Sequence, residues 1–285
     1  MRSIAAMEQR LRLWSGLVLY TFVATHFINH SLGLISIELL ESGRYWFLLV
    51  WRNPLGSILL DSSLVVHVAL VLTALYRRRH LRLPRWEIVR LVMGLLMPVF
   101  LIPHIFGTQV LNATYGIDDS YAYVVSDMWV RHPDSVILQS LLLVLAWTHG
   151  SMGVHYWLRF RPWYPRASPW LRSAALLLPV FGLLGFVHAG RSFGAMWDEP
   201  NWHAETFPSG VDQQNDVVLG WANIAVAIFV LLAGSVFVAR WLRSYLQRRR
   251  GVVRLTYPRG RRVVIPRGTT VLEASRSAGI PHASI

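Results

Sequence analysis

The chain contains no cysteine, which excludes disulfides, zinc–thiolate sites and cysteine nucleophiles within it. It also contains no lysine: all 28 basic residues are arginines, and only 15 residues are acidic. The net charge of +13 is compatible with nucleic-acid binding, but the arginines lie between hydrophobic segments. This distribution indicates a membrane topology signal and attraction to anionic lipid headgroups, with no nucleic-acid partner.

Charged side chains are missing altogether from long stretches of the sequence. Residues 13–37 and 135–158 contain no Asp, Glu or Arg. A run of roughly 20 apolar residues is long enough to cross a bilayer, and only a helix satisfies its own backbone there. We therefore predict an all-α membrane protein with six transmembrane helices, at 11–37, 55–77, 86–113, 135–160, 171–191 and 217–243.

The loops between these helices alternate in charge. Acidic residues gather in one set of loops, and arginines gather at the N-terminus and in the other set, at 76–87, 159–172 and 240–250. Because positively charged loops stay in the cytoplasm, we expect both termini to be cytoplasmic in a multi-pass protein of the lipid bilayer.

The composition changes from about Gly251. Segment 253–280 alternates, turns at Pro-Arg-Gly, alternates again and ends in a short helical pattern. This predicts a β-hairpin followed by a helix, at the start of a soluble domain over 251–285 that follows a transmembrane domain over 1–250. Such a short segment cannot bury a core, so we expect the sequence to be a piece of a longer protein.

Several histidines lie in the predicted spans, where ionisable residues are costly and usually functional. A single histidine of this kind is ordinarily a neutral side chain bonded to a neighbouring helix. Histidines at matched depths on four helices instead favour a cofactor site. The six well inside the spans are His26, His30, His67, His104, His149 and His155, and His188 lies near the end of the fifth span.

Two of these histidines lie near mid-membrane. His67 is ten residues from Arg77, and His149 is ten residues from Arg159. At the helical rise, both lie roughly 15 Å from the arginine-rich side. They therefore form one predicted pair on the second and fourth spans.

Another two lie deeper, on the first and third spans. His30 is eighteen residues from Arg12 and His104 nineteen from Arg85, which places both at roughly 27 Å. Histidines at two levels about 12 Å apart cannot bind the same zinc or copper ion. Neutral imidazole is a good axial ligand for haem iron, and bundle interiors hold such cofactors. We predict a four-helix core with two b-type haems, ligated by His30/His104 and His67/His149.

Three histidines are alternatives to this assignment. His26 is one turn from His30 on the same face, and His188 is an alternative to His104 in the deeper pair. His155 faces another side and is a candidate contact for a haem propionate or a quinone.

Arginines and small residues complete the predicted cofactor surroundings. Arg52, Arg159 and Arg191 are candidate propionate partners, because guanidinium pairs well with carboxylate, and contact with lipid headgroups is the ordinary alternative. Small residues that would let a flat macrocycle approach, or that simply pack helices together, are Gly33, Ala69, Gly107, Gly150 and Gly153.

Four segments resemble the cytochrome b subunit of di-haem succinate:quinone oxidoreductases. They are HSLGLIS (30–36), HVALVLTALY (67–76), FLIPHIFGTQV (100–110) and HGSMGVHYW (149–157). That family pairs the first segment with the third and the second with the fourth, in agreement with the depths. A sixth helix departs from its five-helix pattern.

A more extensive resemblance is to the membrane anchor of a group of bacterial class III adenylate cyclases. It is carried by THFINHSLGLIS (25–36), PHIFGTQV (103–110), WTHGSMGVHYWLRFRPWY (147–164) and GFVHAGR (185–191). The resemblance implies that a [2Fe–2S] ferredoxin-like domain and a cyclase domain follow in the parent protein. Segment 268–285 looks like the part of such a ferredoxin before its cluster cysteines, so the cluster ligands and the cyclase active site are absent here.

The resemblance implies a redox-sensing anchor in a bacterial inner membrane. It would bind haem b, respond to a quinone or quinol pool, form a homodimer and regulate cAMP synthesis from ATP. The first alternative is a quinone-reacting cytochrome b subunit of an electron-transfer complex. A second is a receptor that binds an external ligand at 192–216, with Trp197, Trp202 and His203, although this segment is also expected to act as a lid.

Overall fold

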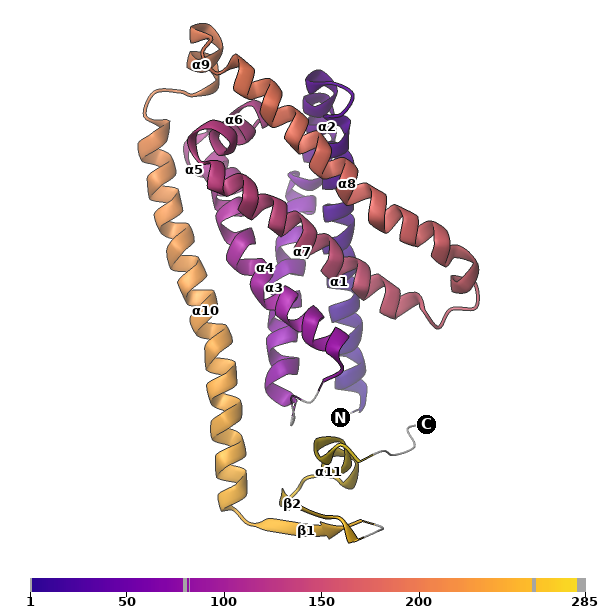
Figure 1. Cartoon of the computed structure of the whole chain (residues 1–285). Coiled ribbons are helices and arrows are strands. Elements are labelled where there is room, and N and C mark those ends of the chain that lie inside the picture. The colour runs from indigo at the N-terminus through magenta and orange to yellow at the C-terminus, as the bar shows by residue number, and fades with distance from the viewer. Residues whose placement is uncertain (1, 79–80, 82, 258–259, 281–285) are drawn as a thin grey trace.

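The computed structural model describes residues 2–78, 81, 83–257 and 260–280, and most of them are helical. Six helices are long and apolar enough to cross a membrane, as predicted (Figure 1). They are α1 (Arg2–Leu32), α3 (Pro54–Arg77), the continuous helix formed by α4 (Arg85–Ile105), η1 (Phe106–Val110) and α5 (Leu111–Tyr115), then α7 (Pro133–Leu158), α8 (Tyr164–Met196) and α10 (Val211–Arg249).

The segment between the first two spans is a further helix, α2 (Ile37–Trp51), where the sequence was expected to form a loop. The Ser36 side chain caps it by accepting a hydrogen bond from the Leu39 amide. Asn53 caps α3 in the same way, with proline at the first helical position. The 15 residues of α2 are too few to cross a bilayer, which is why a search for spans missed this helix.

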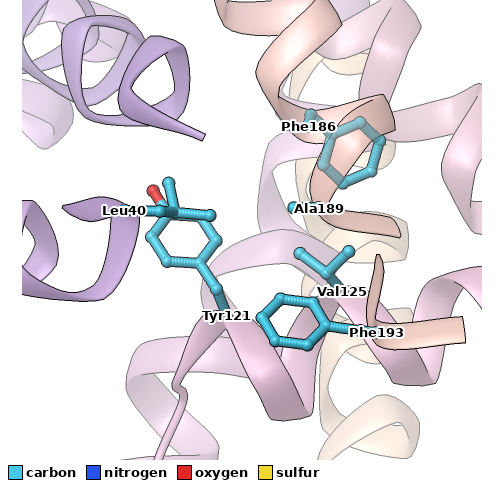
Figure 2. Close-up of a cluster of buried hydrophobic side chains, with 6 residues drawn as sticks. All are labelled: Leu40, Tyr121, Val125, Phe186, Ala189 and Phe193. Carbon is cyan, nitrogen blue, oxygen red and sulfur yellow. The ribbon is translucent and has the colours of Figure 1, made fainter. Parts of the chain in front are cut away.

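Short helices cover one end of the bundle. Helices α2, α6 (Tyr121–Ser126) and α9 (Pro200–Thr206) gather there, and we call it the cap end; both termini lie at the opposite, terminal end (Figure 1). Trp202 of α9 packs against Phe193 of α8, so α9 lies against the cap end of the bundle. Figure 2 shows the apolar cluster beneath it, which joins α2, α6 and α8 through Leu40, Tyr121, Val125, Phe186, Ala189 and Phe193.

Helix α1 packs against α3, α7 and α8, whereas α4 packs against α7 and α10. The contact between α1 and α8 is made backbone to backbone. A Cβ at Gly185 would lie 2.0 Å from the His30 carbonyl oxygen, and a Cβ at Gly33 would lie 2.9 Å from the Gly185 carbonyl oxygen. Only glycine therefore fits at Gly185, and α8 is held tightly against α1 at the level of His30.

The tail forms the predicted hairpin and helix. Helix α10 runs to Arg249 and is followed by antiparallel strands β1 (Val252–Thr256) and β2 (Arg262–Pro266). Helix α11 (Val271–Ala278) then begins with a capping box between Thr270 and Glu273. Residues 281–285 of the predicted tail lie outside the described residues.

Candidate functional site

His67 forms a hydrogen bond with α1. Its Nδ1 lies 3.2 Å from the Ser15 hydroxyl, which also lies 3.2 Å from the Arg12 carbonyl oxygen. When the Ser15 hydroxyl donates to that carbonyl, its oxygen accepts from the imidazole and Nδ1 carries the hydrogen. In the neutral ring this leaves the lone pair of Nε2 free to bind a metal.

His149 on α7 has the same arrangement. Its Nδ1 lies 3.2 Å from the Arg90 carbonyl oxygen on α4. Because a carbonyl oxygen only accepts, Nδ1 donates and Nε2 keeps its lone pair. Hydrogen bonds of this kind to the second ring nitrogen orient metal-ligating histidines in many proteins.

One glycine lies against each of these rings. A Cβ at Gly16 would lie 3.0 Å from Cε1 of His67, and a Cβ at Gly94 would lie 2.9 Å from Cε1 of His149. Both distances are shorter than an ordinary carbon–carbon contact, so a larger residue would displace the ring. Each ring thus rests on a neighbouring helix that supplies a glycine and an acceptor for Nδ1.

The small residues singled out from the sequence have other surroundings. Gly150 packs against the Tyr20 ring, and Gly33 packs against the α8 backbone. Gly107 and Gly153 have no heavy atom of the described residues near the position of a Cβ. The glycines in contact with the candidate ligand rings are Gly16 and Gly94, which the sequence alone did not identify.

The two cradled histidines form the first of two levels. His67 lies on α3, which packs against α1, and His149 lies on α7, which packs against α4 and α1. Two imidazoles whose Nδ1 atoms have acceptors are a donor set that would hold the iron of a b-type haem. That these two residues share one cofactor stays a prediction.

The second level contains three histidines rather than two. His26 and His30 have their Nε2 atoms 3.1 Å apart, and the ring centroids of His26 and His104 are 6.2 Å apart. His26 therefore contacts both His30 and His104, and two of these three imidazoles would hold the iron of a second haem.

His30 lies toward the cap. Its ring contacts Tyr121 and Phe186, with centroid distances of 5.3 and 6.1 Å. The Nδ1 atoms of His26 and His30 are buried and have no hydrogen-bond partner among the described residues. Such a buried polar atom costs about 1–3 kcal/mol, and that cost favours binding of a group that rearranges the cluster.

His104 precedes an irregular stretch of helix. Pro103 removes one backbone donor, and the π-helical turn η1 begins three residues later, at Phe106. The Thr108 hydroxyl donates to the His104 carbonyl oxygen at 2.7 Å. A π-helical turn beside a candidate ligand is a common feature of functional sites.

The remaining candidate histidines lie away from both levels. The Nδ1 of His155 is 2.6 Å from the Tyr164 hydroxyl at the terminal end. His188 is exposed on α8 and lines a surface hollow. Neither of them therefore lies within the histidine clusters.

The three candidate propionate partners also have defined places. Arg52 forms an ion pair with Asp119 of the chain itself. The Arg159 guanidinium lies over the Tyr156 and Phe160 rings, 4.6 and 4.5 Å from their centroids. Arg191 is exposed beside the hollow that contains His188.

The ion pairs of the cap were not predicted from the sequence. Asp119 accepts hydrogen bonds from Arg44 at 2.7 Å and from Arg52, and its side chain is only 7% exposed. Burial opposes ionisation of this carboxyl, but the two arginines outweigh it and hold its pKa below the usual range. The acidic loop thus fixes α2 to the segment before α6.

No protein-family model matches the chain, and no curated protein or solved structure matches it either. The function is therefore inferred from the geometry of the histidines and from the residue patterns already described.

Proposed function

We propose that this chain is a haem b-binding membrane anchor, which senses the redox state of a quinone/quinol pool and regulates a C-terminal adenylate cyclase making cAMP from ATP. His67/His149 and His30/His104 are the proposed axial pairs, with His26 as the alternative to His30. The anchor is a homodimer in a bacterial cytoplasmic membrane, with both termini in the cytoplasm.

The observation that carries the proposal is the shared cradle of His67 and His149. Each Nδ1 has an acceptor, each Nε2 has no hydrogen-bond partner among the described residues, and each ring rests on a glycine of a neighbouring helix. A histidine with a purely structural role has no need of a free Nε2 inside a bundle. The same arrangement occurring twice, at one level, supports a pair of ligands to one cofactor.

The residues of the chain would orient and insulate that cofactor. Haem iron, when bound, supplies one-electron chemistry between its ferric and ferrous states. Ser15 and the Arg90 carbonyl fix the ligand rings and raise the basicity of the imidazoles through Nδ1.

The continuous helix α10 favours a fused output over a separate subunit. It runs without interruption from Val211 at the cap end to Arg249, three residues before the hairpin. Arg240 donates to the Leu75 carbonyl oxygen, so α10 is attached to the end of α3, the helix that carries His67. The alternative, a quinone-reacting subunit of an electron-transfer complex, predicts turnover with a separate soluble donor.

Haem content per chain tests the proposal. We expect two haems in the wild type, a sharp reduced-minus-oxidised α-band of b type, and loss of one haem in His67→Ala and in His149→Ala. His104→Ala should lose the other haem, and His26→Ala beside His30→Ala should show which of these two is its partner. His203→Ala in α9 is the control. A full complement of haem in His67→Ala or His149→Ala, or no α-band in the wild type, would refute the proposal.

A further inference from the structure

A hollow of about 570 Å³ lies on α8 near the cap end. Three of its lining residues are apolar and three carry hydrogen-bonding side chains. They are Leu34, Leu184, Val187, His188, Arg191 and Ser192. Five of the six come from successive turns of α8, so they form one stripe of that helix.

The polar part of this hollow has no partners within the described residues. His188 and Arg191 are both exposed, and neither forms a hydrogen bond or an ion pair with a described residue. A guanidinium on a membrane-spanning helix is costly unless oxygen acceptors reach it. The two side chains are three residues apart on one helix face, so a single ligand can contact both.

The hollow adjoins the second histidine level. Gly185, one residue from Leu184, lies against the His30 carbonyl oxygen so closely that a Cβ there would be 2.0 Å away. Leu34 is four residues beyond His30 on the α1 side. The hollow therefore lies beside the backbone contact between α1 and α8 at His30.

We propose that the hollow binds the headgroup of a membrane quinone or quinol, an inference that rests on the proposed function and locates its small-molecule partner. Leu34, Leu184 and Val187 contact the flat ring and the start of the isoprenoid tail. Arg191 and Ser192 donate to the oxygens of the ring.

The imidazole of His188 distinguishes this ligand from a phospholipid headgroup. A neutral imidazole both donates and accepts, so it can pair with the carbonyl of a quinone or with the hydroxyl of a quinol. A phosphate diester has only acceptors and would satisfy Arg191 without using the acceptor of His188. The position beside the second histidine level also suits a redox-active ligand.

Equilibrium binding of decyl-ubiquinone tests the proposal, using the purified chain in nanodiscs of neutral phosphatidylcholine. We expect Arg191→Gln and His188→Leu to bind about tenfold more weakly or worse, the loss of one hydrogen bond to a charged or well-placed group. Arg166→Gln, an exposed arginine at the other end of α8, should bind as the wild type does. Haem content, measured on the same samples, should not change in any of the three.

Two results would overturn the proposal. One is equal quinone affinity of the wild type, Arg191→Gln and His188→Leu. The other is loss of quinone binding when phosphatidylglycerol is added to the nanodiscs, which would make the hollow a phospholipid site. A chain that binds quinone through these residues but contains no haem would support this site and refute the proposed function, so the two failures are distinguishable.

Discussion

Ser15→Ala removes the acceptor that fixes His67 and leaves the imidazole itself in place. The hydrogen bond is 3.2 Å long and joins two neutral groups, and the His67 ring is half-buried. Losing it and leaving Nδ1–H unpaired costs about 1–2 kcal/mol of bound-state stability, or about 5- to 30-fold in haem affinity at this level. The imidazole also becomes a weaker donor to iron, so the midpoint potential of this haem should rise.

The assay is competitive transfer of haem to apomyoglobin, followed by the Soret band. Ser15→Ala should release one of the two proposed haems faster than the wild type and retain the other unchanged. Ser62→Ala is the matched control, because Ser62 is exposed on α3 and bonds only to the backbone of its own helix. Equal transfer from the Ser15→Ala variant and the wild type would show that the hydroxyl does not orient a ligand.

Two further substitutions test the packing around the site and its cap. Gly94→Ala places a methyl group 2.9 Å from Cε1 of His149, so we expect about tenfold weaker haem binding at that level, whereas Gly234→Ala on α10 meets no neighbour and should have no effect. Asp119→Asn should lower the free energy of unfolding by about 3 kcal/mol at neutral pH, because it breaks a buried ion pair. Because the folded-state pKa of Asp119 is depressed, its contribution to stability is complete above about pH 4 and is lost as the pH falls through the folded-state pKa. The Asp119→Asn variant should lack this acid-dependent loss of stability. Asp118→Asn, at a carboxylate that is 70% exposed, is the control in thermal and acid unfolding.

The spans were predictable because the cost of burying charge in lipid depends on composition alone. Long, mainly apolar runs gave six helices at the right places, although α1 ends at Leu32, before the predicted end at 37, and α8 and α10 extend beyond the predicted ends, to Tyr164 and to Arg249. Helix α2 was missed for the same reason, since it does not cross the bilayer. Its formation depends on its cap residue Ser36 and on contacts with α1, such as the hydrogen bond from Trp51 to Thr25.

The depth of each histidine was predicted from its distance to flanking arginines, because helical rise is constant, and it stays a prediction. The groups that touch each histidine ring could not be predicted from the sequence. Ser15 and Gly16 contact His67 only because of the rotation and separation of α1 and α3, and the acceptor for His149 is a backbone carbonyl, which no side-chain pattern reveals. A glycine one residue after a serine has no distinguishing mark in a transmembrane sequence.

At the second level, the spacing of histidines in the sequence cannot decide which of them is the ligand. His26 and His30 are four residues apart on α1, so they share one face and spacing cannot choose between them. The choice depends on which neighbour each ring meets: α4 brings His104 to His26, whereas the glycine contact of α8 leaves His30 beside Tyr121 and Phe186. If His26 is the ligand, His30 becomes the group that joins it to the cap, because its ring contacts Tyr121, whose hydroxyl accepts a hydrogen bond from Asn29. A histidine pair on one helix face then supplies both a ligand and the residue that positions it.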